Sequence, residues 1–208
     1  MAKLKLVVFD CDGVMFDSLE ANRHYYNHIL ATFGHPPMDQ EELHYVHIHH
    51  VMDSVRHIFR NYPEDYPKAD QYRQGLDYTP YLKHMRMEPD LPEFLDFLRP
   101  RYHTAISTNR STTMADVLRI FKLGNSFDKV VTALDVKNPK PHPEALHDIL
   151  GHFQVGVDET IYIGDSEVDR DHTKAVGMEL VAFKNPKLDA EYHVTSFMEI
   201  TKLGLFDC

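Results

Sequence analysis

The chain has 208 residues, of which 43% are hydrophobic and 26% charged, so its composition is that of a globular protein and not of a disordered one. Asp and Glu number 32 against 22 for Lys and Arg, and the formal net charge of −10 argues against non-specific binding to nucleic acid. Two cysteines, Cys11 and Cys208, exclude a disulfide-rich scaffold. Because no leader and no apolar run of about 20 residues is recognisable, we expect a cytoplasmic protein without membrane contact.

The first predicted element is a short buried strand over residues 4–9, which is rich in valine and apolar apart from Lys5. It ends at Asp10-Cys11-Asp12-Gly13, where glycine lets the backbone turn sharply. Ligands of open α/β sheets bind at the carboxyl ends of strands, so Asp10 and Asp12 are candidate functional residues. Two carboxylates in a turn can also act simply as caps, and this segment alone leaves both interpretations open.

Residues 17–86 are predicted to form an all-helical insertion, because apolar residues recur there with helical spacing and no convincing strand is present. The two clearest stripes are Tyr26, Ile29, Leu30 and Phe33, and then Val51, Val55, Ile58 and Phe59. The sequence Gly34-His35-Pro36-Pro37 marks a helix stop between them.

The insertion is rich in histidine and includes His44, His47, His49 and His50. Two histidines three positions apart can bind a metal from one face of a helix. The simpler interpretation is a polar helix face, because no cysteine or tight carboxylate cluster completes a site.

After the insertion, strands alternate with amphipathic helices. Helices are predicted around residues 91–98, 114–121 and 146–153, and short strands over 104–107, 129–132, 160–163 and 180–183. This alternation predicts βαβ units, a parallel sheet and an α/β fold with a Rossmann-like core.

A second acidic segment follows the strand predicted at 160–163. Asp165 and Asp169 come directly after Gly164, again at a strand end. If this strand lies beside the first, Asp10, Asp12 and Asp165 converge, and their mutual repulsion requires a cation or a shared proton. Oxygen-only ligands suit Mg²⁺, so we expect a magnesium site.

A phosphate site is predicted beside these carboxylates. Thr108 and Asn109 follow the strand at 104–107, where a hydroxyl and free backbone amides can bind an anion. Lys140 is held between prolines in Asn138-Pro139-Lys140-Pro141, a placement that helix amphipathicity does not explain. Either residue alone could be structural, but together with the acidic cluster they fit a bound phosphate.

These segments together resemble the haloacid dehalogenase (HAD) superfamily. Its four motifs are matched in order by Asp10-Cys11-Asp12-Gly13-Val14-Met15-Phe16-Asp17-Ser18, Thr108-Asn109, Lys140-Pro141, and Gly164-Asp165-Ser166 with Asp169. The position of the insertion resembles the helical type-1 cap of the phosphoglycolate phosphatase and β-phosphoglucomutase branch. The resemblance implies a HAD-like α/β core over 1–14 and 87–208 and a helical cap over 15–86.

The resemblance also implies a mechanism. Asp10 attacks phosphorus and forms an aspartyl-phosphate, and Asp12 acts as general acid and then general base. Mg²⁺ is held by Asp10, the backbone carbonyl of Asp12 and Asp165, while Asp169 supports the metal or orients Lys140. Thr108, Asn109 and Lys140 bind the phosphoryl group.

The implied function is a Mg²⁺-dependent phosphatase for a small phosphomonoester, such as phosphoglycolate or a sugar phosphate. The alternatives are a phosphosugar mutase of the β-phosphoglucomutase type and a non-catalytic HAD-fold binding protein. We expect a monomer or a weak dimer with a small phosphorylated metabolite as its partner.

Two features lie outside the motifs. Asp171-His172 interrupts the apolar face of the helix after Asp165, where relatives often carry small residues. Within the insertion, the turn around Pro36, Pro37 and Met38 is expected to face the core and to contribute to substrate specificity.

Overall fold

The computed structural model describes residues 4–48 and 51–206, and the chain divides into two compact units. The core unit is Met1–Phe16 with Met87–Cys208, and the helical unit is Asp17–Arg86. Residues 15 and 16, which we expected in the insertion, belong to the core unit. There the carbonyl of Met15 accepts a hydrogen bond of 3.0 Å from the amide of Glu88.

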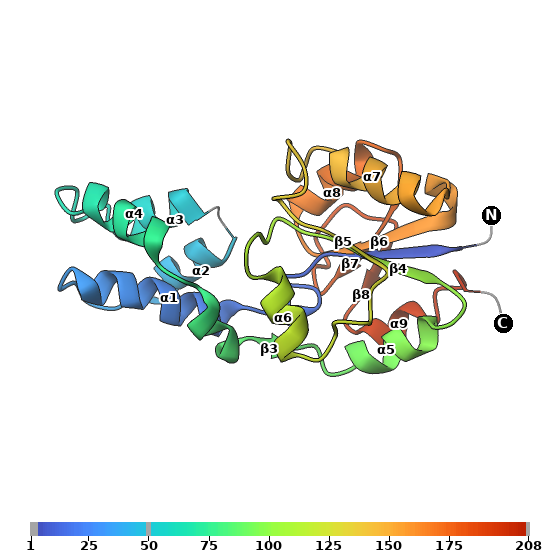
Figure 1. Cartoon of the computed structure of the whole chain (residues 1–208), viewed down its shortest axis with the longest axis horizontal. Coiled ribbons are helices and arrows are strands. Elements are labelled where there is room, and N and C mark those ends of the chain that lie inside the picture. Colours follow the sequence, from blue (N-terminus) through green and yellow to red (C-terminus); the bar gives the residue numbers. More distant parts are fainter. Residues whose placement is uncertain (1–3, 49–50, 207–208) are drawn as a thin grey trace. The chain divides into compact units, whose positions relative to one another are not determined.

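Among the residues described, the core unit contains a sheet of six parallel strands in the order β5-β4-β1-β6-β7-β8 (Figure 1). The strands are β1 (Leu6–Phe9), β4 (His103–Ser107), β5 (Lys129–Val131), β6 (Thr160–Gly164), β7 (Glu179–Phe183) and β8 (Tyr192–Val194). The α/β fold predicted from the alternating pattern is confirmed. β8 was not predicted, because its three residues carry too short a pattern to distinguish it from a loop.

Helices cover both faces of this sheet, with α7 and α8 on one face and α5 and α9 on the other (Figure 1). The helices of the core unit are α5 (Leu91–Leu98), α6 (Met114–Ile120), α7 (Glu144–Phe153), α8 (Glu167–Lys174) and α9 (Phe197–Ile200). Successive side chains of a strand point to opposite faces. Leu6 and Val8 pack in the cluster that includes α7, whereas the ring of Phe9 lies 6.0 Å from that of Phe94 on α5. Both faces of β1 are therefore buried, which explains why it is apolar throughout.

The helical unit contains α1 (Leu19–Thr32), α2 (Gln40–Ile48), α3 (Val51–Ile58), α4 (Tyr66–Gly75) and a 3-10 helix over Thr79–His84. Most residues of the two predicted apolar stripes are buried in its own hydrophobic cluster, so the helical interpretation is confirmed. The expectation that this stretch lacks strands is wrong at its ends. The two-residue strands β2 (Phe16–Asp17) and β3 (Arg86–Met87) pair with each other where the chain passes between units, and two residues are too few to show a period.

No helix within the described ranges is long and apolar enough to span a bilayer.

Candidate active site

The register of β1 against β6 brings two aspartates to the same edge of the sheet. Phe9 lies opposite Ile163 in parallel strands, and the amide of Asp10 donates to the carbonyl of Ile163 at 2.9 Å. Asp165 comes one residue after β6 ends. Both carboxylates therefore leave the sheet at its carboxyl edge, the place where open α/β sheets bind ligands.

Two glycines make room for the acidic side chains. Gly13 has a φ of +81°, in the region that favours glycine, and a Cβ at this position would collide with the carboxylate of Asp165. A Cβ at Gly164 would lie 2.5 Å from the Cβ of Asp169. The chain can approach these carboxylates closely only because both positions lack a side chain.

Three carboxylates form a compact acidic group. Asp10, Asp165 and Asp169 each offer an oxygen, and these oxygens all lie within 4.8 Å of one another. Asp10 and Asp169 are buried and Asp165 is half-buried. Within residues 4–48 and 51–206, no other group of three or more His, Cys, Asp or Glu side chains has this geometry.

That finding also bears on the histidines of the helical unit. His44 and His47 belong to no such group, and His49 and His50 lie outside the described residues.

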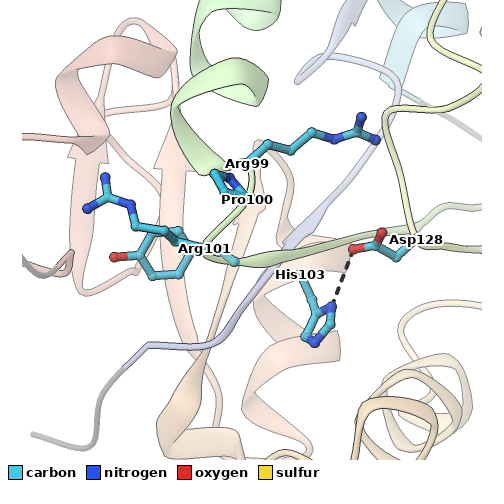
Figure 2. Close-up of a pocket in the computed structure, with 6 residues that line it drawn as sticks. Arg99, Pro100, Arg101, His103 and Asp128 are labelled. Carbon is cyan, nitrogen blue, oxygen red and sulfur yellow. Dashed lines mark ion pairs between the residues drawn. The ribbon is translucent and has the colours of Figure 1, made fainter.

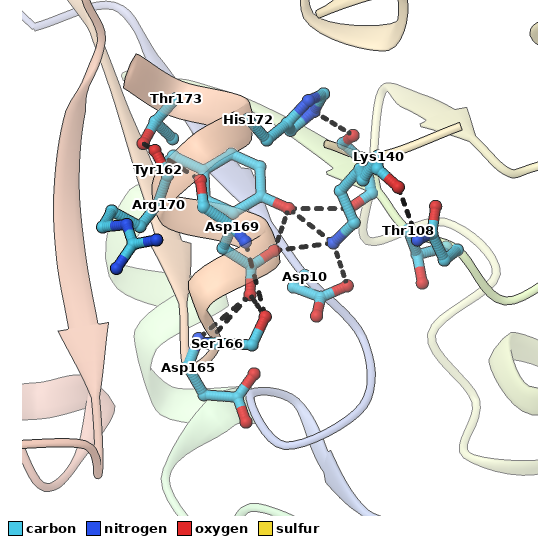
Figure 3. Close-up of polar contacts among 12 residues, drawn as sticks. Asp10, Thr108, Lys140, Tyr162, Asp165, Ser166, Asp169, Arg170, His172 and Thr173 are labelled. Carbon is cyan, nitrogen blue, oxygen red and sulfur yellow. Dashed lines mark hydrogen bonds and ion pairs between the residues drawn. The ribbon is translucent and has the colours of Figure 1, made fainter. Parts of the chain in front are cut away.

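Lys140 carries the positive charge of the site (Figure 3). Its Nζ lies 2.8 Å from Oδ1 of Asp10 and 2.7 Å from Oδ1 of Asp169. It also donates to the hydroxyl of Tyr162 at 2.9 Å. The Lys140 side chain is only 4% exposed, and although burial lowers its pKa, the two carboxylates outweigh burial and raise it well above the ordinary value. The lysine therefore stays charged between the two acids.

The acidic group holds more negative charge than Lys140 neutralises. Burial raises the pKa of Asp10 to about 7, even though Lys140 acts to lower it. Burial, together with repulsion from Asp10 and Asp169, raises the pKa of Asp165 to about 8. Without a cation, the group relieves this repulsion by holding protons near neutral pH. A divalent cation would remove the same repulsion.

Asp169 differs from the other two carboxylates because both of its oxygens are engaged. Oδ1 accepts from Lys140, while Oδ2 accepts from the hydroxyl of Ser166 at 2.6 Å and from the amides of Ser166 and Asp165 at 3.1 and 3.2 Å. Burial acts to raise the pKa of Asp169, but Lys140 and Ser166 prevail and hold it below the usual value. Asp169 is thus an ionised carboxylate that fixes Lys140 and the start of α8.

Asp12 does not join this group, although Asp10 is only two residues away. Its carboxylate instead receives two hydrogen bonds from Arg110, 3.0 Å from Nε to Oδ2 and 2.6 Å from Nη2 to Oδ1. A metal contact from the Asp12 side chain is therefore not supported by this arrangement. The contact implied by the resemblance was through the backbone carbonyl, and that remains an expectation.

Thr108 and Asn109 follow β4 at the same edge. Thr108 is buried, its amide donates to the carbonyl of Val131 at 3.0 Å, and its hydroxyl accepts from the amide of Arg110 at 3.1 Å. The Asn109 side chain donates to the backbone carbonyl of Lys140 at 3.0 Å. The Asn109 side chain therefore helps to hold the backbone at Lys140 in place. The expected role of Asn109 in phosphate binding stays a prediction.

Sequence reasoning missed the buried polar residues behind Lys140. The hydroxyl of Tyr162 donates to the carbonyl of Ser107 at 2.9 Å, and the hydroxyl of Ser107 lies 3.0 Å from Nε2 of His172. Burial, aided by the charge of Lys140, lowers the pKa of His172 to about 4, so the ring is neutral. The sequence signal that could have revealed His172 was the Asp171-His172 pair, which interrupts the apolar face of its helix. Asp171 is exposed, whereas His172 is buried and lies against the Ser107 hydroxyl.

A cavity of about 270 Å³ lies away from these carboxylates. It is lined by Arg99, Pro100, Arg101, Tyr102, His103 and Asp128 (Figure 2). His103 is the first residue of β4, so the cavity lies at the amino edge of the sheet, opposite the acidic group. In this fold the carboxyl edge binds the ligand, and we assign the cavity no part in the chemistry.

A parallel sheet with this acidic group and lysine at its carboxyl edge defines a class of hydrolase. The profile of the haloacid dehalogenase-like hydrolase family matches residues 7–183, well over half of the chain. The chain belongs to this family, and the resemblance seen in the sequence is confirmed.

Three comparisons place the chain within the family. A solved structure of a HAD-superfamily hydrolase of subfamily IA, variant 1, from Geobacter sulfurreducens is 41% identical, covers 96% of each chain and superposes with a TM-score of 0.87. A pyrophosphatase PpaX from Bacillus cereus is 26% identical over 177 residues, spanning 80% of this chain and 77% of its own. A phosphoglycolate phosphatase from Pseudomonas savastanoi pv. phaseolicola is 27% identical over 186 residues, spanning 86% of this chain and 68% of its own. The expectation of a hydrolase with a HAD-like core is thus confirmed.

Proposed function

We propose that this protein is a Mg²⁺-dependent phosphatase that hydrolyses a small phosphomonoester, of the phosphoglycolate or sugar phosphate type, through an aspartyl-phosphate on Asp10. The observation that carries the proposal is the acidic group of Asp10, Asp165 and Asp169, with the Lys140 ammonium directly on Asp10. The names of the relatives, a pyrophosphatase and a phosphoglycolate phosphatase, support phosphate chemistry.

The donor atoms of the site fit magnesium. They are all carboxylate oxygens. Burial, together with repulsion from neighbouring carboxylates, raises the pKa values of Asp10 and Asp165 to about 7 and about 8. Asp10 and Asp165 would hold the ion, with Asp169 and the backbone carbonyl of Asp12 as further expected contributors. When bound, Mg²⁺ would neutralise the charge of the carboxylates and of the phosphoryl oxygens.

In the first step, formation of the aspartyl-phosphate, Asp10 is the nucleophile and Lys140 stabilises negative charge. A carboxylate oxygen of Asp10 attacks phosphorus while the bond to the leaving oxygen breaks, and Asp12 supplies the proton for that oxygen. Lys140 already binds Asp10, so its ammonium lies beside the position that the phosphoryl group takes and stabilises the negative charge there. The Thr108 hydroxyl, in the loop after β4 at the same edge, is proposed to bind a further phosphoryl oxygen.

Hydrolysis of the aspartyl-phosphate completes the cycle. Water attacks phosphorus, Asp12 takes a proton from that water, and the Asp10 carboxylate leaves. A mutase would use the same residues and transfer the phosphoryl group to a sugar hydroxyl.

The helical unit is proposed to act as a cap that selects the substrate. The acidic group and Lys140 belong to the core unit, which is therefore proposed to supply the chemistry. A cavity of about 230 Å³ within the helical unit includes Pro36 and Pro37 in its lining, the turn residues expected to affect specificity.

Hydrolysis of p-nitrophenyl phosphate tests the function. We expect turnover with Mg²⁺, loss of turnover after exhaustive chelation, and poor replacement by Ca²⁺, whose longer bonds and higher coordination number disturb the nucleophile. Activity that survives chelation would refute the metal requirement. A panel of phosphorylated metabolites would then rank substrates, and isomerisation of a sugar phosphate without release of phosphate would instead support a mutase.

A further inference from the structure

The structure separates the two aspartates of the first motif. Asp10 lies in the acidic group with Lys140, while the carboxylate of Asp12 is bound by Arg110. Arg110 follows Thr108-Asn109, so it reaches Asp12 from the loop after β4, the strand that pairs with β1. The proposed mechanism assigns no role to this arginine.

The contact between Arg110 and Asp12 is bidentate. Nε donates to one carboxylate oxygen at 3.0 Å and Nη2 to the other at 2.6 Å. Two parallel hydrogen bonds fix the plane of a carboxylate as well as its position, which a lysine ammonium, acting as a point charge, cannot do. The pair therefore sets the direction in which Asp12 presents its oxygens.

Arg110 is itself held in place. Its side chain is only 8% exposed, Nη1 donates to the hydroxyl of Thr113 at 2.9 Å, and its amide donates to the hydroxyl of Thr108 at 3.1 Å. The Arg119–Asp116 pair offers a contrast, because its arginine side chain is 70% exposed and its residues lie three positions apart on one helix. Exposed pairs of that kind contribute little to stability and do not fix the orientation of a carboxylate.

We propose that Arg110 is a positioning residue that orients the Asp12 carboxylate for proton transfer to the leaving group and from the attacking water. This inference rests on the proposed function, because Asp12 acts as acid and base only in that reaction. Proton transfer requires hydrogen-bond geometry, and a displacement of about 1 Å can cost roughly 100-fold in rate. Arg110 affects turnover through Asp12 and does not contact the substrate.

The experiment is a double-mutant cycle with two substrates, p-nitrophenyl phosphate and glycerol 2-phosphate, in the presence of Mg²⁺. The variants are Arg110→Met, Arg110→Lys, Asp12→Asn and the double variants, with Arg119→Met as the matched control. We expect Arg110→Met to lower kcat on glycerol 2-phosphate by about 10- to 100-fold, since the alkoxide leaving group needs the proton. The loss on p-nitrophenyl phosphate is expected to be several-fold smaller, and KM is expected to change by less than about 2-fold for both substrates.

The Asp12→Asn background tests whether the effect of Arg110 passes through Asp12. In that background, Arg110→Met is expected to change kcat by less than about 2-fold, because the group that it positions is gone. Arg110→Lys keeps the charge and loses the fork geometry, so it is expected to show the same selective loss and to fold even if the Met variant does not. Arg119→Met is expected to behave as wild type.

Other results would overturn the proposal. A raised KM with unchanged kcat would show that Arg110 binds the substrate. A loss that is equal for both substrates, or that persists in the Asp12→Asn background, would show a role independent of Asp12. Wild-type protein that hydrolyses neither phosphate would overturn the proposed function and this inference together, whereas a wild-type enzyme with an additive cycle would overturn the inference alone.

Discussion

The ion pairs of Lys140 in the core unit are more deeply buried than the ion pairs of the helical unit. In the core unit, Lys140 pairs with Asp169 across 29 positions of sequence, and both side chains are at most 4% exposed. In the helical unit, ion pairs such as Arg73–Asp70 and Arg56–Asp53 join residues three positions apart on the same helix. The first kind depends on the register of a sheet, whereas the second needs only one helical turn.

This difference has an energetic consequence. Breaking a buried pair leaves an uncompensated charge and costs about 3–5 kcal/mol, while an exposed pair contributes about 0–1 kcal/mol. Substitutions at the carboxyl edge of the sheet should therefore have large effects on activity or stability, and substitutions in the helical unit should change selectivity with little other cost. Four experiments test this expectation.

The largest effect is expected for Asp10→Asn. Turnover should fall by at least about 10⁴-fold, because the amide cannot act as the nucleophile. The free energy of unfolding should stay within about 1 kcal/mol of wild type, since the substitution also removes one negative charge from a crowded group. Steady-state kinetics and urea denaturation measure the two quantities. Asp96→Asn, at an exposed position of α5, is the control, and substantial phosphatase activity in clean Asp10→Asn would remove Asp10 from the nucleophile's role.

Lys140→Met should be the most destabilising of these changes. It leaves Asp10 and Asp169 buried without their counter-charge, so we expect a loss of about 3–5 kcal/mol in the free energy of unfolding at neutral pH. Lys129→Met is the matched control, because Lys129 pairs with Asp148 at 2.8 Å but that carboxylate is 54% exposed. The control should lose less than about 1 kcal/mol. Equal losses in urea denaturation would contradict the expected difference between a buried and an exposed ion pair.

Metal removal should make stability depend on pH. The pKa values of Asp165 and Asp10 are raised to about 8 and about 7, so the folded protein holds protons that the unfolded chain releases near pH 4. The resulting stability is complete below about pH 4 and is lost as pH rises toward 7 to 8, at up to about 1.4 kcal/mol per pH unit for each proton involved.

Magnesium should reverse this loss. Thermal unfolding in a chelator should show Tm falling from pH 5 to pH 8 through these two groups, and Mg²⁺ should raise Tm more at pH 8 than at pH 5. Mg²⁺ stabilisation of the same size at both pH values would argue that the ion does not replace protons on Asp10 and Asp165.

The smallest effect on stability is expected in the helical unit. Replacing both Pro36 and Pro37 by Ala should shift the relative kcat/KM of substrates by several-fold, while the free energy of unfolding changes by about 1 kcal/mol or less. Phosphorylation of Asp10 by a small generic donor should be unaffected. A substrate panel compares the double variant with wild type, and an unchanged ranking in a folded protein would place specificity elsewhere in the helical unit.

The sequence predicted more of the site in the core unit than of the packing in the helical unit. The acidic group could be predicted because Asp10 and Asp165 each follow an apolar run, and neighbouring parallel strands end at the same edge. The contact of Tyr162 with Lys140 could not be predicted, because an aromatic residue within an apolar run has the pattern of a core side chain. Arg110 was missed for another reason. A lone cation after a strand end carries no sign of which of several nearby acids it will bind.

In the helical unit, periodicity predicted the helices and little more. The ring of His35 stacks on that of Tyr62 with centroids 3.6 Å apart, and the ring of Tyr45 stacks on that of His57 at 3.7 Å. These contacts join residues at least a dozen positions apart, and they depend on how helices pack, which a helical period does not specify. The strands β2 and β3 at the ends of the unit were not predicted, because two residues are too few to show the alternating pattern of a strand.

The double use of the Asp169 carboxylate has a consequence for amide hydrogen exchange. One oxygen holds Lys140, and the other accepts from the amides of Asp165 and Ser166 at the start of α8. Fraying of this helix end would release the lysine, and withdrawal of the lysine would loosen the helix end. The amides of Asp165 and Ser166 should therefore exchange with solvent as slowly as the interior of α8, although helix ends ordinarily open first. Protection at these two positions would report the integrity of the site in the absence of any substrate.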